Sequence, residues 1–174
     1  MRRSDILLLA NFTVGQFDAL VARGLAPISV SQRGRGWATF SADDALRFGL
    51  FAALNRAGVA QAQSAAIVRS QYDMLLHRLE QRASNDVWFG VFKSVAIAEG
   101  EPSAALSMPL IATLSEVAVE IARVQRQAEE SDPVESIMVI NATAVVRSML
   151  QRADAYGIAD DRLSELARRV GAVR

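Results

Sequence analysis

The 174-residue chain is 51% hydrophobic and 22% charged, a composition that can bury a core in one domain or in two small ones. It contains no cysteine, which excludes disulfides, thiolate metal sites and cysteine nucleophiles. It contains a single histidine, His77. We therefore expect a globular, cytoplasmic protein that is not an enzyme and has no catalytic residue, metal or cofactor. The apolar runs are too short to span a membrane, so no membrane partner is expected.

Charge is distributed unevenly along the chain. Residues 1–70 hold eight arginines against four aspartates, which gives +4, and residues 71–174 hold eleven basic against fifteen acidic groups, which gives −4. A basic first part favours a polyanion as its partner. The sequence predicts a head over residues 1–70, a linking helix over residues 60–84 and a body over residues 85–174.

Two short helices open the head. They are expected over residues 4–12 and 13–23, with apolar side chains at helical spacing. Thr13 can cap the second helix, and Gly24 stands where a C-terminal glycine belongs. Two short helices this close together predict a helix-turn-helix.

A hairpin and two longer helices complete the head. Short β-prone runs follow Pro27 and are joined by Arg-Gly-Arg-Gly at residues 33–36, which predicts a hairpin. Ser41, with an acid three residues later, opens a helix that extends to about Ala57. A longer helix follows over residues 60–82.

Three motifs follow one another between Ile6 and Val68: "TVGQFDALVARGLAP", "RGRGWATFSADDAL" and "LNRAGVAQAQSAAIV". In this order they resemble the DNA-binding head of the MerR family and of its relatives among phage excisionases and small terminase subunits. The resemblance covers a little over a third of the chain. It implies a winged helix-turn-helix whose second helix enters the major groove of duplex DNA and whose hairpin, the wing, lies beside the phosphate backbone.

The resemblance also implies which residues contact DNA. Arginine suits a wing because its planar fork can hold two phosphate oxygens, and neighbouring glycines let the backbone approach. The expected DNA-binding residues are Arg33 and Arg35 in the wing, Arg2 and Arg3 as an N-terminal arm, and Gln16 and Thr13 at base edges. The alternative is that Gly34 and Gly36 only close a hairpin and that its arginines keep it soluble.

The chain departs from the family pattern on the second helix. Activators of the family usually carry arginines and a tyrosine there, and the matching positions are Gly15, Asp18 and Ala19. Asp18 repels phosphate and Gly15 offers no side chain. This departure puts strong, sequence-specific binding in doubt. It leaves three alternatives: weak binding to DNA, binding whose affinity depends on dimerisation, or contacts with proteins in place of DNA.

The linking helix is expected to join two copies of the chain. Val68, Tyr72, Leu75 and Leu79 keep a three-four spacing along one of its faces. We therefore assign these four residues to a homodimer interface.

The body is expected to be a small α+β domain, which makes the whole chain α+β and mostly helical. Residues 86–102 predict a strand or a hairpin, and residues 109–129 an amphipathic helix. A short buried strand should follow at "SIMVI". Two further helices are expected, one after Asn141 over residues 142–156 and a final short one over residues 160–170.

Aromatic residues of the body and of the linking helix have two interpretations. Trp88, Phe89, Phe92, Tyr72 and Met74 either line an effector pocket or belong to the core, which is the commoner role for aromatic residues on a strand. His77 has no second histidine or cysteine to act with it, so we expect a surface histidine or a capped structural one.

The sequence therefore leaves two DNA-binding functions and one alternative. The first is a dimeric transcription regulator of bacterial or phage origin that docks its head on duplex DNA. The second is a phage packaging or architectural protein that gathers DNA with little sequence preference. The third is a protein-interaction module that keeps the winged-helix fold without binding DNA. No small-molecule effector is identified by the sequence.

Overall fold

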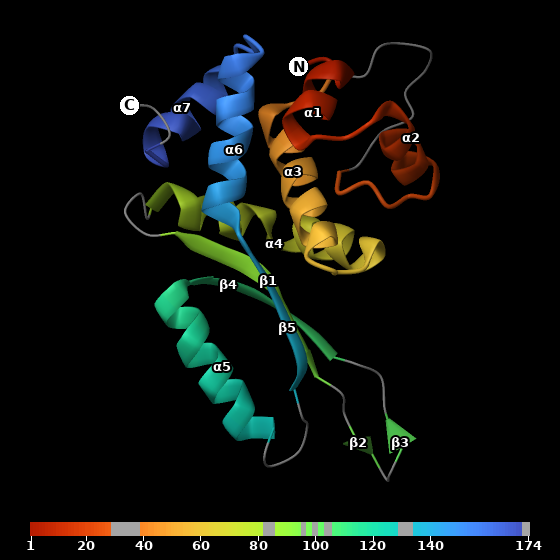
Figure 1. Ribbon diagram of the computed structural model, residues 1–174, viewed down its shortest axis with the longest axis vertical. Helices are drawn as coiled ribbons and strands as arrows, with labels where there is room; N and C mark the ends of the chain where they lie inside the picture. Colours follow the sequence, from red (N-terminus) through yellow and green to blue (C-terminus); the bar gives the residue numbers. More distant parts are fainter. Residues whose placement is uncertain are drawn as a thin grey trace.

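The computed structural model describes residues 1–28, 39–81, 86–94, 97–98, 101–102, 106–128 and 134–171, with an α+β fold that is mainly helical (Figure 1). The described elements are, in chain order, α1 (Arg3–Ala10), α2 (Val14–Ala22), α3 (Ala42–Arg56), α4 (Gln61–Gln81), β1 (Val87–Ser94), β2 (Ile97–Ala98), β3 (Glu101–Pro102), β4 (Leu106–Thr113), α5 (Leu114–Ala128), β5 (Val134–Asn141), α6 (Ala142–Ala155) and α7 (Asp161–Arg169). None of the described helices is by itself long and apolar enough to cross a membrane. Among the described helices, α1 and α2 taken together across a bend of 104° are the one pair with the length and composition for it.

Helix α3 occupies the centre of the molecule. Ten of its fifteen residues are buried, and a helix that is apolar on nearly every side must be covered on nearly every side. It contacts α1, α4, α6 and β5. The predicted capping box is confirmed, since Ser41 Oγ accepts a hydrogen bond from Asp44 N and an Asp44 carboxylate oxygen accepts one from Ser41 N. The helix ends before Gly58, whose φ of +94° favours glycine.

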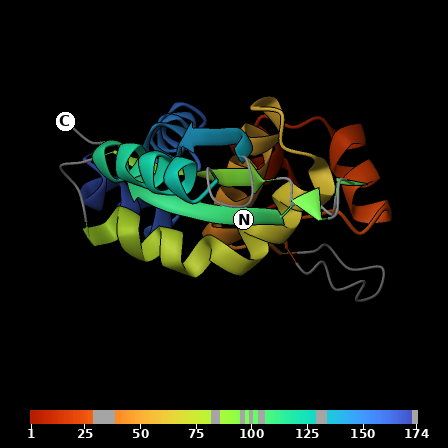
Figure 2. The same cartoon turned by 90° about the horizontal axis from the view of Figure 1, so that it is seen from below.

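A three-stranded antiparallel sheet in the order β4–β1–β5 separates α5 from the other helices (Figure 2). The alternation of side chains along β1 explains this layering. Val87, Phe89 and Val91 join the main core on the side of α4 and α6, whereas Trp88 and Phe92 pack with α5 in a smaller cluster. The three aromatic residues of β1, Trp88, Phe89 and Phe92, thus pack in the core.

The prediction of one helix over residues 109–129 is wrong in its first part. Residues 106–113 form strand β4, which pairs with β1 along its whole length, and the helix begins only at Leu114. Short apolar runs fit a helix or a strand equally well, and here the tertiary partner β1 decides. Pro109 is tolerated because β4 is an edge strand, where one side of the backbone needs no ladder hydrogen bond.

The other predicted elements of the body are confirmed. Strands β1 and β5 lie where they were expected, and Asn141 caps α6, since its side-chain oxygen accepts a hydrogen bond from Ala144 N at 2.8 Å. Gly157, with a φ of +64°, follows the last turn of α6. Asp160 caps α7 by accepting from two backbone N–H groups.

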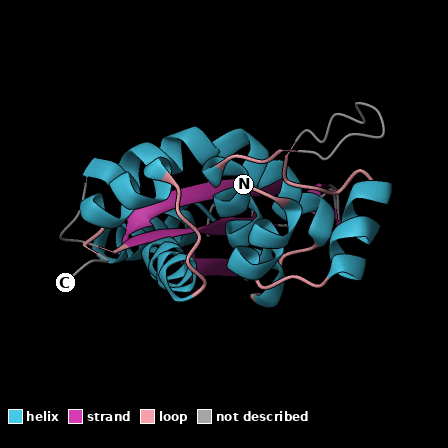
Figure 3. Ribbon diagram, turned by 90° about the horizontal axis from the view of Figure 1, so that it is seen from above, coloured by secondary structure: helices cyan, strands magenta, loops and turns pink. Residues whose placement is uncertain are grey.

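The packing does not follow the expected division into head and body. One continuous core extends from Ile6 on α1 to Val170 after α7. Figure 3 shows the helices gathered around the sheet, and the sequence colours of Figure 1 show that they come from both parts of the chain. Helices α3 and α6 approach so closely that a Cβ atom on Gly49 would lie 2.1 Å from the sulfur of Met149. The C-terminal helices therefore complete the core that the N-terminal helices begin.

A substitution at Gly90, in the middle of β1, tests how closely β1 packs against β5. A Cβ atom there would lie 2.0 Å from Met138 O and 2.7 Å from Val139 Cα, and backbone atoms cannot move aside as a flexible side chain can. We expect Gly90→Ala to lower the free energy of unfolding by about 3 kcal/mol or more, measured by urea denaturation. Gly15→Ala is the control, because a Cβ atom at Gly15 meets nothing within 4 Å, and its unfolding midpoint should not fall.

Candidate nucleic-acid interface

Helices α1 and α2 are two short helices at the start of the chain. They are bent by 104° relative to each other, and three residues join them. Asn11 makes the turn with a left-handed φ of 57°. Thr13 then caps α2 as predicted: its hydroxyl accepts from Gln16 N, and the Gln16 side-chain oxygen accepts from Thr13 N at 2.9 Å.

Helix α2 is held by one apolar face and exposes the rest. Phe17 and Leu20 are buried in the core, where the Phe17 ring lies 5.1 Å from the ring of Phe48. The outward face, at helical spacing, carries small or apolar side chains and one carboxylate: Val14, Gly15, Asp18 and Ala22. This outward face can approach a groove closely, but it offers few hydrogen-bonding groups for base edges.

Arg3 is engaged with α2. Its guanidinium forms an ion pair with Asp18, donates to Val14 O at 3.4 Å and lies 4.8 Å from the centre of the Phe17 ring. The expected role of Arg3 as a free arm therefore needs correction, because these contacts fix α1 against α2. The same pair neutralises the carboxylate that the sequence placed on the second helix.

The structure describes only some of the other residues that are predicted to contact DNA. Arg2 is exposed at the start of α1. Thr13 and Gln16 are exposed too, but their side chains form the capping box, so reading a base with Gln16 would have to leave these hydrogen bonds intact or replace them. Arg33 and Arg35 lie outside the described residues, so their role in a wing stays a prediction.

Hydrogen bonds hold the described residues on both sides of the segment that carries those two arginines. Before it, the Arg69 guanidinium on α4 donates to Gly24 O at 3.0 Å and to Ala26 O at 2.6 Å. After it, Phe40 and Met1 exchange backbone hydrogen bonds: the Met1 ammonium donates to Phe40 O, and Phe40 N donates to Met1 O. No sequence pattern indicates the role of Arg69, because its partners are backbone carbonyls.

The four residues assigned to a dimer interface on α4 lie in the core of a single chain. Val68, Tyr72, Leu75 and Leu79 are all 3% exposed or less. Their three-four spacing marks the face with which α4 packs on α3 and the sheet, which replaces the expected contact with a second copy. Of the other predicted residues of this helix, Met74 and His77 are exposed, and His77 Nε2 lies 2.8 Å from the Gln81 amide nitrogen.

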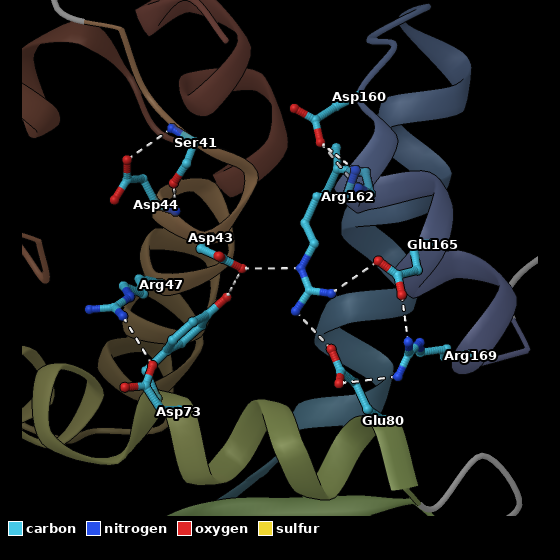
Figure 4. Close-up of polar contacts among 12 residues, drawn as sticks. Ser41, Asp43, Asp44, Arg47, Asp73, Glu80, Asp160, Arg162, Glu165 and Arg169 are labelled. Carbon is cyan, nitrogen blue, oxygen red and sulfur yellow. Dashed lines mark hydrogen bonds and ion pairs between the residues drawn. The ribbon is translucent and has the colours of Figure 1, made fainter.

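A polar network joins α3, α4 and α7 beside this buried face (Figure 4). Arg162 of α7 pairs with Glu80 at 2.7 Å and with Asp43 at 3.8 Å. The Tyr72 hydroxyl donates to Asp43 at 2.7 Å, and the Arg47 guanidinium lies 4.2 Å from the centre of the Tyr72 ring. The network therefore fixes α7 against α3 and α4, a structural role.

Comparison with known proteins adds no assignment. No protein-family model matches the chain, and a search of curated proteins finds none that matches it. The resemblance to the MerR family stays a prediction. In the described ranges no group of three or more histidine, aspartate or glutamate residues could hold a metal ion.

Tyr72 gives the network a measurable pH dependence. Burial, the hydrogen bond to Asp43 and the charge of that carboxylate raise the pKa of Tyr72 well above its usual value. The neutral phenol is therefore favoured in the folded state, so its contribution is complete below the unfolded pKa of about 10 and is lost as the pH rises beyond it. Above pH 10 the unfolding free energy should fall more steeply, by up to about 1.4 kcal/mol per pH unit, in the wild type than in Tyr72→Phe. Parallel slopes in urea titrations would contradict this.

Proposed function

We propose that this protein is a DNA-binding regulator that docks α2 on duplex DNA. The observation that carries the proposal is the pair α1–α2: two helices at 104°, a three-residue turn, and a second helix held by one face while the others are exposed. This is the arrangement by which a helix-turn-helix presents its second helix to the major groove. The basic charge of residues 1–70 supports a polyanion as the partner.

Most of the binding energy would come from the phosphate backbone. The outward face of α2 lets the helix approach the groove, while Arg2, together with Arg33 and Arg35 of the predicted wing, supplies the cations. Asp18 is paired with Arg3, which lowers the repulsion that its carboxylate would exert on phosphate. We therefore expect binding that depends strongly on salt.

One observation favours a second candidate, an architectural or packaging protein. The side chains on the outward face are Val14, Gly15, Asp18 and Ala22, and of these only Asp18 can hydrogen-bond to a base. Gln16, the best side chain for adenine, is used in the cap of α2. A helix of this kind holds DNA with little sequence preference, as gathering or wrapping DNA requires.

Fluorescence anisotropy over a salt series distinguishes these functions. The wild type is measured on the duplex upstream of its own gene and on a scrambled duplex, beside an Arg2→Ala, Arg33→Ala, Arg35→Ala triple variant. Each lost phosphate contact should lower the slope of log K against log salt by about one unit. An Arg126→Ala, Arg168→Ala variant, which removes exposed cations from α5 and α7, should keep the wild-type slope.

Each outcome has a consequence. Preference for the upstream duplex supports the regulator, and equal binding to both duplexes supports the architectural candidate. Absence of binding at low salt contradicts both and leaves a protein-interaction module. Sedimentation on the same samples tests the predicted homodimer, which now has no assigned interface.

Asp18→Asn provides a second test, in which the affinity for DNA is expected to rise and not to fall. The change removes the only carboxylate from the outward face of α2 and releases the Arg3 guanidinium. If this face meets DNA, affinity at low salt should rise roughly threefold to tenfold. Asp161→Asn, which removes an exposed carboxylate at the start of α7, is the matched control and should bind like the wild type. Unchanged or weaker binding by a folded Asp18→Asn variant would show that another face is used.

A further inference from the structure

A cavity of about 420 Å³ lies between α2 and the C-terminal half of α3. We name it the α2–α3 cavity. Its apolar part is formed by Phe12, Leu20, Phe51 and Ala52, and the two phenylalanine rings stack with their centres 6.2 Å apart. Its volume is within the usual range for small-molecule sites, about 300–1,000 Å³.

The polar part of the α2–α3 cavity consists of arginines and side-chain amides. Arg23 comes from the end of α2 and Arg56 from the end of α3, and the amides are those of Asn11, Gln16, Asn55 and Gln61. None of the described residues that line the cavity carries a carboxylate. Apolar surface beside two cations and several N–H donors is complementary to an anion attached to an apolar group.

The hydrogen bonds inside the cavity leave donors for a ligand. Gln61 accepts a hydrogen bond from Arg23 at 2.7 Å through its side-chain oxygen, and Gln16 accepts one from Thr13 N through its own. The amide nitrogens of both glutamines therefore remain to donate. Arg23 is also fixed by a hydrogen bond to Ala19 O, so its guanidinium is held in place before any ligand binds.

Positive charge accumulates at this corner of the molecule. Arg152 of α6 lies near Arg56, and burial followed by the charge of Arg56 lowers the pKa of Arg152. Arg152 donates to Leu9 O, the carbonyl of a residue near the end of α1. An anion bound at Arg56 would reduce the repulsion between the two guanidinium groups.

A larger cavity of about 630 Å³, between α6 and α7, lacks this excess of positive charge. Asp154 and Arg168 both line it, so its charges oppose each other. Size alone therefore does not select a ligand there, whereas the charge of the α2–α3 cavity does.

We propose that the α2–α3 cavity binds a small organic anion, in which a carboxylate or phosphate is attached to a flat apolar group. The anion lies between Arg23 and Arg56, and the apolar group lies against the partly exposed ring of Phe12. The site goes beyond the DNA-binding function proposed above and does not depend on it, because the ligand is bound by the protein alone.

Binding is measured by titration calorimetry and by ¹⁵N chemical shifts, without DNA. The probes are benzoate and phenyl phosphate, which have both parts of the ligand, inorganic phosphate, which has only the anion, and benzyl alcohol, which has only the ring. We expect millimolar or tighter binding of at least one ring-bearing anion, with shifts in the side-chain amides of Gln16, Asn55 and Gln61. Inorganic phosphate and benzyl alcohol should bind at least about tenfold more weakly.

Two variants locate the site. Arg23→Gln, Arg56→Gln replaces both exposed cations and should weaken binding of the ring-bearing anion at least about tenfold, with an unchanged circular dichroism spectrum. Arg168→Gln makes the same change in the cavity between α6 and α7 and should bind like the wild type.

Three results would overturn the proposal. The first is no binding of either ring-bearing anion by the wild type at about 20 mM. The second is equal binding by the Arg23→Gln, Arg56→Gln variant, which would place the anion elsewhere. The third is movement of the cavity amides with a DNA duplex or inorganic phosphate but with neither ring-bearing anion, which would make the cavity a contact for phosphate alone.

Discussion

The burial of α3 is the constraint on which the rest of this structure depends. A helix with apolar residues on nearly every side has to be enclosed, and the N-terminal helices cannot enclose it alone. Helix α6 covers the remaining side from the other end of the chain, where the Met149 side chain packs directly against Gly49. The chain must therefore close on itself, because the C-terminal helices belong to the same core as α1.

The requirements of packing and of function compete on α2. Phe17 and Leu20 hold the helix to the core, and the Arg3–Asp18 pair holds it to α1. These contacts position α2 but use charges and amides that a DNA-reading helix normally presents outward. On one side of α2 there remains the outward face, whose small side chains allow DNA to come close. On the other side there remains the basic, amide-rich α2–α3 cavity. The helix is thus better equipped to meet a backbone or a small anion than to read bases.

Helix α4 shows how a correct periodicity can be assigned to the wrong partner. The three-four spacing of Val68, Tyr72, Leu75 and Leu79 is that of any helix with one buried face. Within one chain, α3 and the sheet cover that face, and the network around Arg162 closes its edge with α7. A contact between copies and a contact within the chain demand the same apolar residues, so periodicity does not separate them.

The sequence by itself determined the local elements, because their signals are local. Thr13, Ser41, Asn141 and Asp160 cap helices through hydrogen bonds to backbone groups two or three residues away, and Gly24, Gly58 and Gly157 end helices through a positive φ. It could not determine that residues 106–113 would be a strand, since the partner strand β1 decides this. The site was predictable only in its residue types. That Arg3 would pair with Asp18, that Arg69 would bind carbonyls, and that Arg23 and Arg56 would share a cavity was decided by tertiary structure, because each depends on which helices the burial of α3 brings together.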